Sequence, residues 1–129
     1  MLFRSLHATL GIKTPLGALD VSFYRDDFDQ KGLHRNIKAS DIPFEVEGRR
    51  LILVDDVLYT GRTIRAAMNV LFDYGRPACV QLAALIDRGG RELPIAGDYV
   101  GGAIKLAASQ SLELLRDGAG KLSFKLNEN

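Results

Sequence analysis

Hydrophobic and polar positions alternate most clearly between residues 51 and 86, where two apolar runs flank an amphipathic segment. The run at 51–54 (LILV) is continuous, which is typical of a strand covered on both faces. The run at 79–86 (CVQLAALI) indicates a second buried strand. Between them, a helix is predicted over 63–74 from apolar residues at helical spacing, namely Ile64, Ala67, Met68, Leu71 and Phe72. Strand, helix and strand in this order predict a βαβ unit and a parallel α/β sheet.

The remaining patterns are weaker. Thr63 stands at the N-cap or in the first turn of the predicted helix, and Gly75 with Pro77 supplies its stop. Elsewhere we predict a helix over 1–10, a strand over 18–24, a polar functional arm over 25–40, a short strand and a turn at Gly48 over 44–50, and a closing strand over 121–126. The stretch after Asp87 is turn-rich. We expect a single domain over residues 1–129.

Composition narrows the class of protein only slightly. The chain has 129 residues, 47% of them hydrophobic and 26% charged, which excludes disordered and collagen-like classes. A net charge of +1 gives no global attraction to nucleic acid or to a membrane, and no apolar stretch reaches the length of a membrane span. The single cysteine, Cys79, lies in an apolar run, so we expect a buried thiol and a reducing, cytoplasmic setting.

The candidate chemistry lies between the first apolar run and the helix. Ligands of open α/β sheets bind beyond the carboxyl ends of the strands, and we expect residues 55–63 to form the loop at such an end. Thr60, Gly61 and Thr63 lead into the start of the helix, where backbone N–H groups favour a phosphate. Asp55 and Asp56 repel a phosphate and suit hydroxyl groups or a hydrated cation. A ligand shaped like ribose 5-phosphate satisfies both halves of this loop.

Other motifs explain these residues less well. A Walker A loop requires a glycine where Asp56 stands and a lysine where Arg62 stands, and no G-x-G-x-x-G is present. A phosphoacceptor receiver domain also begins with a strand that ends in paired acids, and Asp87 could serve as its acceptor. That alternative leaves the T-G-R-T turn unexplained. The two aspartates could also be no more than a solvated strand end.

The segment LILVDDVLYTGRT resembles the phosphoribosyl pyrophosphate (PRPP) signature of type I phosphoribosyltransferases. The flanking segments LDVSFYRDDF, ASDIPFEVEGRR, IRAAMNVLFDYGRPACVQLAALIDRGGRELPI and DYVG resemble, more narrowly, the PyrR family of pyrimidine operon attenuators with uracil phosphoribosyltransferase activity. The resemblance covers about 16–101. It implies a type I phosphoribosyltransferase-like parallel sheet flanked by helices.

The resemblance also implies an activity, a cofactor and partners. Uracil would displace pyrophosphate from PRPP to give UMP, with Mg²⁺ as cofactor, in a homo-oligomer that also binds pyrimidine leader RNA. Asp55 and Asp56 would be the catalytic pair that holds the ribose hydroxyls and helps to organise the magnesium shell. The PRPP-binding residues would be Asp55, Asp56, Val57, Leu58, Tyr59, Thr60, Gly61, Arg62 and Thr63. The remaining roles would fall to Arg25, Asp26 and Asp27 in a flexible loop, Arg88 in the hood near the base, and Arg91 at an RNA contact.

The chain also departs from the family pattern. Nothing in residues 1–15 corresponds to the family's pyrophosphate-loop strand with its T-R-G turn, so we expect an N-terminally truncated domain that lacks this strand and the N-terminal helix. Ala96 and Gly102 replace basic residues of the family, which weakens the expected attraction to RNA. Two hypotheses therefore stay open: a uracil phosphoribosyltransferase, and a UMP-sensing RNA-binding attenuator with weak or no catalysis.

Overall fold

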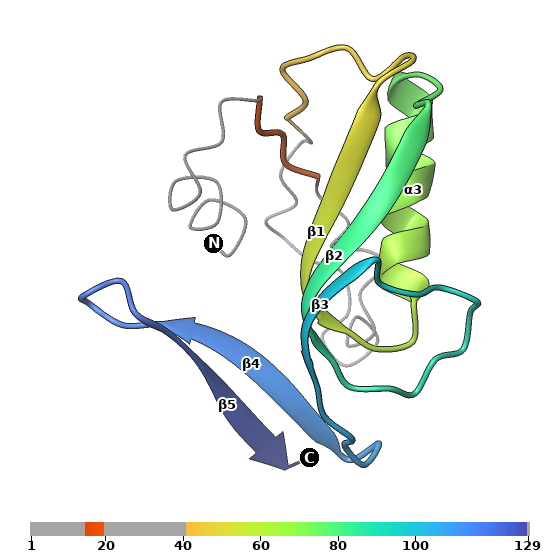
Figure 1. The fold of residues 1–129 in the computed structure, drawn as a ribbon. Helices are drawn as coiled ribbons and strands as arrows, with labels where there is room; N and C mark the ends of the chain where they lie inside the picture. Colours follow the sequence, from red (N-terminus) through yellow and green to blue (C-terminus); the bar gives the residue numbers. More distant parts are fainter. Residues whose placement is uncertain (1–14, 20–40, 129) are drawn as a thin grey trace, which may run out of the picture.

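The computed structural model describes residues 15–19 and 41–128. The predicted helix over 1–10, most of the predicted strand over 18–24 and the polar arm over 25–40 lie outside the described residues. Figure 1 shows the elements that the described part forms, in chain order: β1 (Arg50–Leu58), α3 (Arg62–Tyr74), β2 (Cys79–Asp87), β3 (Tyr99–Ala103), β4 (Gln110–Arg116) and β5 (Leu122–Glu128).

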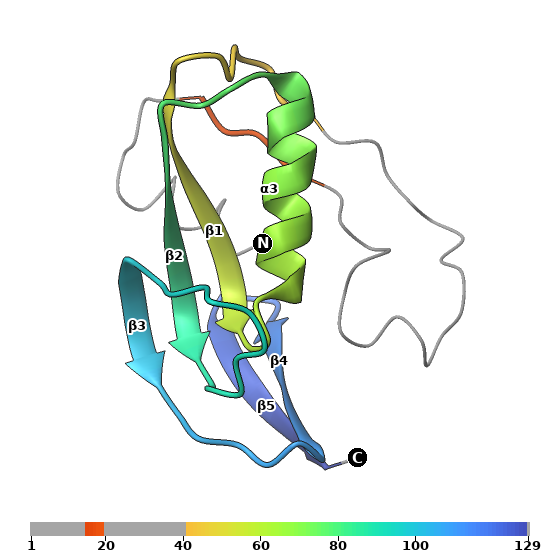
Figure 2. The same cartoon turned by 90° about the vertical axis from the view of Figure 1, so that its right-hand side faces the viewer.

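The predicted βαβ unit is confirmed. Strands β1 and β2 are parallel neighbours with Leu53 opposite Leu82, and α3 connects them. Helix α3 covers one face of the sheet (Figures 1 and 2). The core forms at this contact from Leu58, Ile64, Leu82 and Ala84, with Leu53, Met68 and Ile95 packed against it. The helix therefore fixes the position of the loop that precedes it.

Three details of the predicted burial are wrong. Ile52 is 60% exposed and Arg50 is exposed as well, so the first part of β1 is not covered on both faces. The reason is that α3 covers only one face and β1 is an edge of the described sheet. Phe72, expected on the buried face of the helix, is 59% exposed, whereas Ala66 is buried. Cys79, expected to be buried, is only partly so.

The C-terminal third contains more regular structure than predicted. Strand β3 lies parallel to β2 and gives the order β1-β2-β3, although the sequence indicated only turns there. Strands β4 and β5 form a separate antiparallel hairpin, in which β5 matches the predicted closing strand and β4 was not predicted. The turn at Gly48 is confirmed by its φ of 71°, but the short strand expected within 44–50 is absent before Arg50. Among the helices described, none has the length and apolar character of a membrane span.

Candidate functional site

A shallow depression lies where β1 meets the start of α3. The sheet and the helix both contribute to its wall, which consists of Asp55, Val57, Leu58, Tyr59, Gly61, Thr63 and Ile64. All seven residues belong to the segment that the sequence singled out, or follow it directly. The structure therefore brings most of that segment together around one concave surface.

The paired aspartates lie within strand β1, not in a loop. The strand continues to Leu58, so the connection to α3 is only 59–61 and the expected loop over 55–63 is wrong. Successive residues of a strand project from opposite faces of the sheet. Asp55 lines the depression, whereas Asp56 is not among the lining residues. The Asp56 N–H donates to Asp55 Oδ1 at 2.8 Å. Leu58 is a core residue with 1% exposure.

The connection itself is a tight turn at the start of a helix. Gly61 is the N-cap of α3 with φ 95°, a left-handed conformation that glycine adopts without steric cost. As a glycine, this N-cap residue has no side chain that could cap the helix. Thr60 is 5% exposed, and its Oγ1 accepts the Arg62 N–H at 3.2 Å. Of the two threonines, only Thr63 is among the residues that line the depression.

A second segment, residues 88–95, holds this turn from the side. The N–H groups of Glu92 and Leu93 both donate to the Thr60 carbonyl, at 2.9 and 3.1 Å. Beside them, the exposed Arg62 and Glu92 side chains form an ion pair at 2.8 Å. A Cβ added to Gly61 would lie 3.0 Å from Ile95. The sequence analysis did not identify segment 88–95 as a support for the site.

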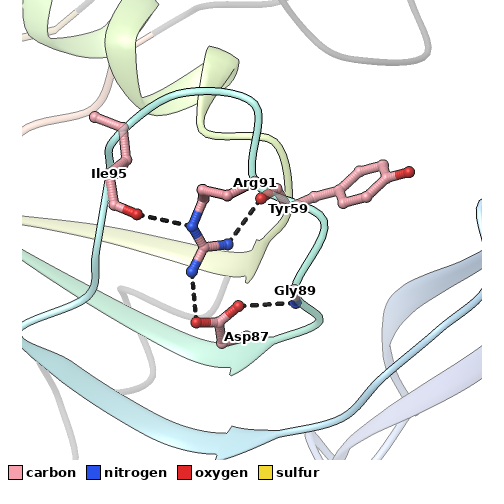
Figure 3. Close-up of polar contacts among 5 residues, drawn as sticks. All are labelled: Tyr59, Asp87, Gly89, Arg91 and Ile95. Carbon is pink, nitrogen blue, oxygen red and sulfur yellow. Dashed lines mark hydrogen bonds and ion pairs between the residues drawn. The ribbon is translucent and has the colours of Figure 1, made fainter.

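Arg91 ties three parts of the molecule together (Figure 3). Its Nη1 donates to the Tyr59 carbonyl at 2.7 Å and its Nε to the Ile95 carbonyl at 2.7 Å. Its Nη2 pairs with Asp87 Oδ2 at 2.6 Å, and Asp87 Oδ1 accepts the Gly89 N–H at 2.9 Å. The bond from Arg91 lowers the pKa of Asp87; partial burial opposes this shift, and the Gly89 N–H adds to it. The spacing of Asp87 and Arg91, four residues apart, was the available sequence signal.

Arg88 is buried, with 5% exposure, and is not a surface charge. Its Nη1 and Nη2 donate to the carbonyls of Gln110 and Ala107 at 2.8 and 3.0 Å. Its guanidinium carbon lies 3.8 Å from the centre of the Tyr59 ring, a cation–π contact. Its Nε is buried without a hydrogen-bond partner. Arg88 therefore links the end of β1 to the beginning of the hairpin.

The remaining predicted site residues are placed as follows. Arg25, Asp26 and Asp27 lie outside the described residues. Arg91 stays a predicted RNA contact, although its three guanidinium nitrogens each bond within the chain. The described residues contain no group of three or more histidine, cysteine or acidic side chains that could enclose a metal ion.

A concave surface at the carboxyl end of a parallel strand, beside the start of a helix, is the arrangement that phosphate-bearing ligands use in α/β proteins. The family model described as the phosphoribosyl transferase domain matches residues 1–113. The class defined by the fold and this match is the type I phosphoribosyltransferase, an α/β protein with a parallel sheet.

Curated relatives narrow this class. A Bifunctional protein PyrR of Pseudomonas fluorescens is 52% identical over 125 residues, which cover 97% of this chain and 73% of the relative. The PyrR protein of Pseudomonas entomophila is 58% identical over 86% of this chain and 64% of its own length. The PyrR protein of Ralstonia nicotianae is 61% identical over 81% of this chain and 60% of its own length. The chain thus belongs to the PyrR family, and it spans about two thirds of the length of these relatives.

The matches to solved structures cover a smaller part of this chain. A hypoxanthine phosphoribosyltransferase of Trypanosoma cruzi is 30% identical, with a TM-score of 0.48 over 60% of this chain and 41% of that one. A hypoxanthine-guanine phosphoribosyltransferase of Bacillus anthracis is 25% identical, with a TM-score of 0.46 over 53% of this chain and 40% of that one.

Proposed function

We propose that this domain binds PRPP at the β1–α3 junction and transfers its phosphoribosyl group to uracil, giving UMP and pyrophosphate. The observation that carries the proposal is the depression itself, in which an acid of β1 and the first turn of α3 share one wall. Such a wall offers a carboxylate for sugar hydroxyls and main-chain N–H groups for a phosphate. The match of residues 1–113 to the phosphoribosyl transferase domain supports the transfer of a phosphoribosyl group.

Each residue has a role that follows from its chemistry. The 5′-phosphate would accept hydrogen bonds from the main chain at Gly61 and from the Thr63 hydroxyl. Asp55 would accept hydrogen bonds from the ribose hydroxyls and orient C1 toward the base. In the reaction the C1–O bond to pyrophosphate breaks, a bond from C1 to a uracil nitrogen forms, and that nitrogen loses its proton. The developing positive charge at C1 is stabilised by a nearby carboxylate.

The donor set suits Mg²⁺. This ion keeps several waters and is usually bound by one or two carboxylates together with substrate phosphates. Asp55, a partly buried carboxylate in the wall of the depression, is a hard oxygen ligand of that kind. Asp56 would take part through water or through the ribose. When bound, Mg²⁺ supplies charge neutralisation for the departing pyrophosphate.

Protection of the domain against thermal unfolding tests the proposal. We expect PRPP with Mg²⁺ to raise the Tm of the wild type, and Asp55→Asn and Thr63→Ala to remove most of this rise. A lost hydrogen bond to a charged group corresponds to roughly 1.5–3 kcal/mol, or about tenfold or more in affinity. Asp56→Asn, on the opposite face of β1, tests whether the second acid takes part. Equal protection in wild type, Asp55→Asn and Thr63→Ala would refute the site.

The catalytic step needs its own assay. Conversion of radiolabelled uracil to UMP with PRPP and Mg²⁺ is expected in the wild type and reduced by Asp55→Asn. The setting we propose is the cytoplasm, where a single unpaired cysteine stays reduced. Binding of PRPP without any conversion of uracil would refute transferase activity of this chain while leaving the binding site in place.

The word "bifunctional" in the name of the relatives favours a second candidate function, a UMP-sensing attenuator that binds pyrimidine leader RNA. A mobility-shift assay with leader RNA, in the presence and absence of UMP, separates this function from catalysis. Binding that UMP strengthens, together with undetectable uracil conversion, would favour the attenuator.

A further inference from the structure

We propose that one face of the β4–β5 hairpin docks against the same face of a second copy of this chain, in an arrangement that exchanges the ends of the two hairpins. The family resemblance implied a homo-oligomer but gave it no surface. This inference depends on the residues of the hairpin and is independent of the proposed transferase reaction.

The two sides of the hairpin differ in polarity. Residues that lie opposite each other in register project from the same side of a sheet, together with every second residue along each strand. The apolar face defined in this way consists of five residues that share one side, namely Leu112, Leu114, Leu122, Phe124 and Leu126. The other side is polar, with Glu113 opposite Lys125, and Leu115 is its apolar exception. The hairpin is therefore amphipathic.

The apolar face is not part of the core that the structure describes. No residue of β4 or β5 is buried, and Leu126 is 50% exposed. The described core forms around α3, whereas the hairpin extends away from the parallel sheet on the side opposite α3 (Figures 1 and 2). A two-stranded hairpin is only marginally stable in water without a further layer against its apolar side. A partner on this face would supply that layer.

The two ends of the apolar face carry opposite charges. Arg116 lies on this side at the turn end, and Glu128 lies on it at the other end, opposite Gln110. Both charged residues are exposed, and Glu128 Oε1 accepts from Gln110 Nε2 at 2.8 Å. In the turn, Asp117 Oδ1 accepts the N–H of Lys121, whose positive charge balances that of the carboxylate. The turn end is thus net positive and the opposite end net negative.

These charges make the face complementary to itself under one of two rotations. Stacked sheets keep their strands within about 30° of each other. A twofold axis along the strands would bring the two Arg116 side chains to the same end, where like charges repel. A twofold axis across the strands exchanges the ends, so that Arg116 of each copy lies over the end with Gln110 and Glu128 of the other. Charge therefore selects the exchanged arrangement.

The same rotation pairs the apolar residues. It places Leu126 of one copy over Phe124 of the other, and Leu112 over Leu114. Each contact occurs twice, as an isologous interface requires. The two hairpins then form a four-stranded sandwich whose inner layer is apolar.

The size of the face sets the strength of the contact. Two neighbouring strands of seven residues present a face of roughly 24 Å by 10 Å. A standard interface buries about 800 Å² per partner, which is considerably more. We therefore expect a weak dimer, which forms at about 10–100 μM. In dilute solution, where the chain is monomeric, substitution of Arg116 should leave the hairpin unchanged.

The first test is sedimentation velocity on the full chain over a concentration series that extends to about 1 mM, well above the expected dissociation constant. We expect Leu126→Ser, in the apolar face, to weaken dimerisation about tenfold or more, because each dimer loses this side chain twice. Leu115→Ser is the matched control, since Leu115 is 38% exposed on the opposite side of the same hairpin. This control should dimerise as the wild type does.

Charge reversal tests the exchanged ends. Arg116→Glu makes both ends of the face negative, and Glu128→Lys makes both ends positive. Each variant alone should dimerise about threefold to tenfold more weakly than the wild type, whereas an equimolar mixture of the two should recover dimerisation. Both substitutions are at exposed positions, so this test remains decisive if Leu126→Ser does not fold.

An isotope-filtered NOE experiment on mixed labelled and unlabelled chains reports the register. The exchanged arrangement predicts a contact between Leu126 methyl groups of one copy and the Phe124 ring of the other. The alternative rotation would give a contact between Leu126 and Leu112 instead, and would overturn the proposed arrangement.

The remaining outcomes also decide. A wild type that stays monomeric throughout the series would show that another occupant covers the face, and would overturn the inference. Dimerisation that Leu126→Ser leaves unchanged, or that Leu115→Ser weakens equally, would place the interface elsewhere. A mixture of the two charge-reversed variants that dimerises no better than either alone would overturn the exchange of ends.

Discussion

At the scale of single residues, Gly61 is the position where backbone conformation and packing constrain the chain together. Its φ of 95° is unfavourable for any residue with a Cβ, and an added Cβ would press on Ile95. Gly48 shares the left-handed conformation, with φ 71°, but a Cβ there would meet open space. Substitution of these two glycines therefore separates the cost of conformational strain from the cost of steric overlap.

We expect Gly61→Ala to lower the free energy of unfolding by about 2–4 kcal/mol, the sum of strain and overpacking. Gly48→Ala should cost only the strain, about 1–2 kcal/mol. Urea unfolding followed by circular dichroism measures both. Equal losses in the two variants would show that Ile95 yields to the added methyl group and that packing contributes nothing.

Sequence reasoning identified several of the residues that line the depression. Asp55, Gly61 and Thr63 were predicted from their types and spacing, and the structure places all three around the depression. The bonds of Arg91 could not be predicted in the same way. They join residues up to 32 positions apart, and no local pattern indicates which carbonyl a distant guanidinium will reach.

At the scale of elements, the hairpin of β4 and β5 is separate from the parallel sheet (Figure 1). Arg88 connects the two, since it donates to the carbonyls of Ala107 and Gln110 at the base of the hairpin. A carbonyl that is shielded from water costs roughly 1–3 kcal/mol when it loses its donor, and of these two residues Gln110 is the more buried. The hairpin therefore depends on a side chain from the end of β2.

Replacement of Arg88 by Met keeps an unbranched apolar stem and removes the hydrogen-bond donors. We expect a loss of about 1–3 kcal/mol in stability, with faster amide hydrogen exchange concentrated in β4 and β5. Arg116→Met, at an exposed position of the hairpin itself, is the matched control and should leave exchange unchanged. Uniform acceleration throughout the chain would contradict a local tether.

The elements differ in how well the sequence predicted them. Strand β2 and helix α3 were predicted almost to the residue, because apolar periodicity dictates which face each one buries. Strand β3 contains two consecutive glycines, Gly101 and Gly102, and glycine is depleted in strands. It exists because it can pair with β2, a long-range contact that local sequence does not report.

At the scale of the whole molecule, stability should depend on pH through Asp87. Its pKa is lowered in the folded chain from an ordinary value of 3.8. A lowered folded pKa stabilises the protein above the unfolded value, and this contribution is lost as the pH falls through the folded pKa. The ion pair with Arg91 joins β2, the turn at 59–61 and segment 88–95, so its loss should be global.

We therefore expect the stability difference between wild type and Asp87→Asn to be constant above about pH 5 and to shrink progressively below pH 3.8. Chemical unfolding at a series of pH values measures the difference. Arg91→Met, which removes the donor, should reduce the same pH dependence. A difference that stays constant down to pH 2.5 would show that Asp87 does not titrate differently in the folded chain.

A turn whose carbonyls are held by a distant segment has a consequence for how such a motif can be transferred. Arg62 faces outward to Glu92, so its identity contributes little to the shape of the turn. The conformation of the turn depends instead on a support 32 residues downstream. A graft of the T-G-R-T signature into a foreign scaffold would reproduce the letters without the conformation, unless the segment that holds its carbonyls were grafted with it.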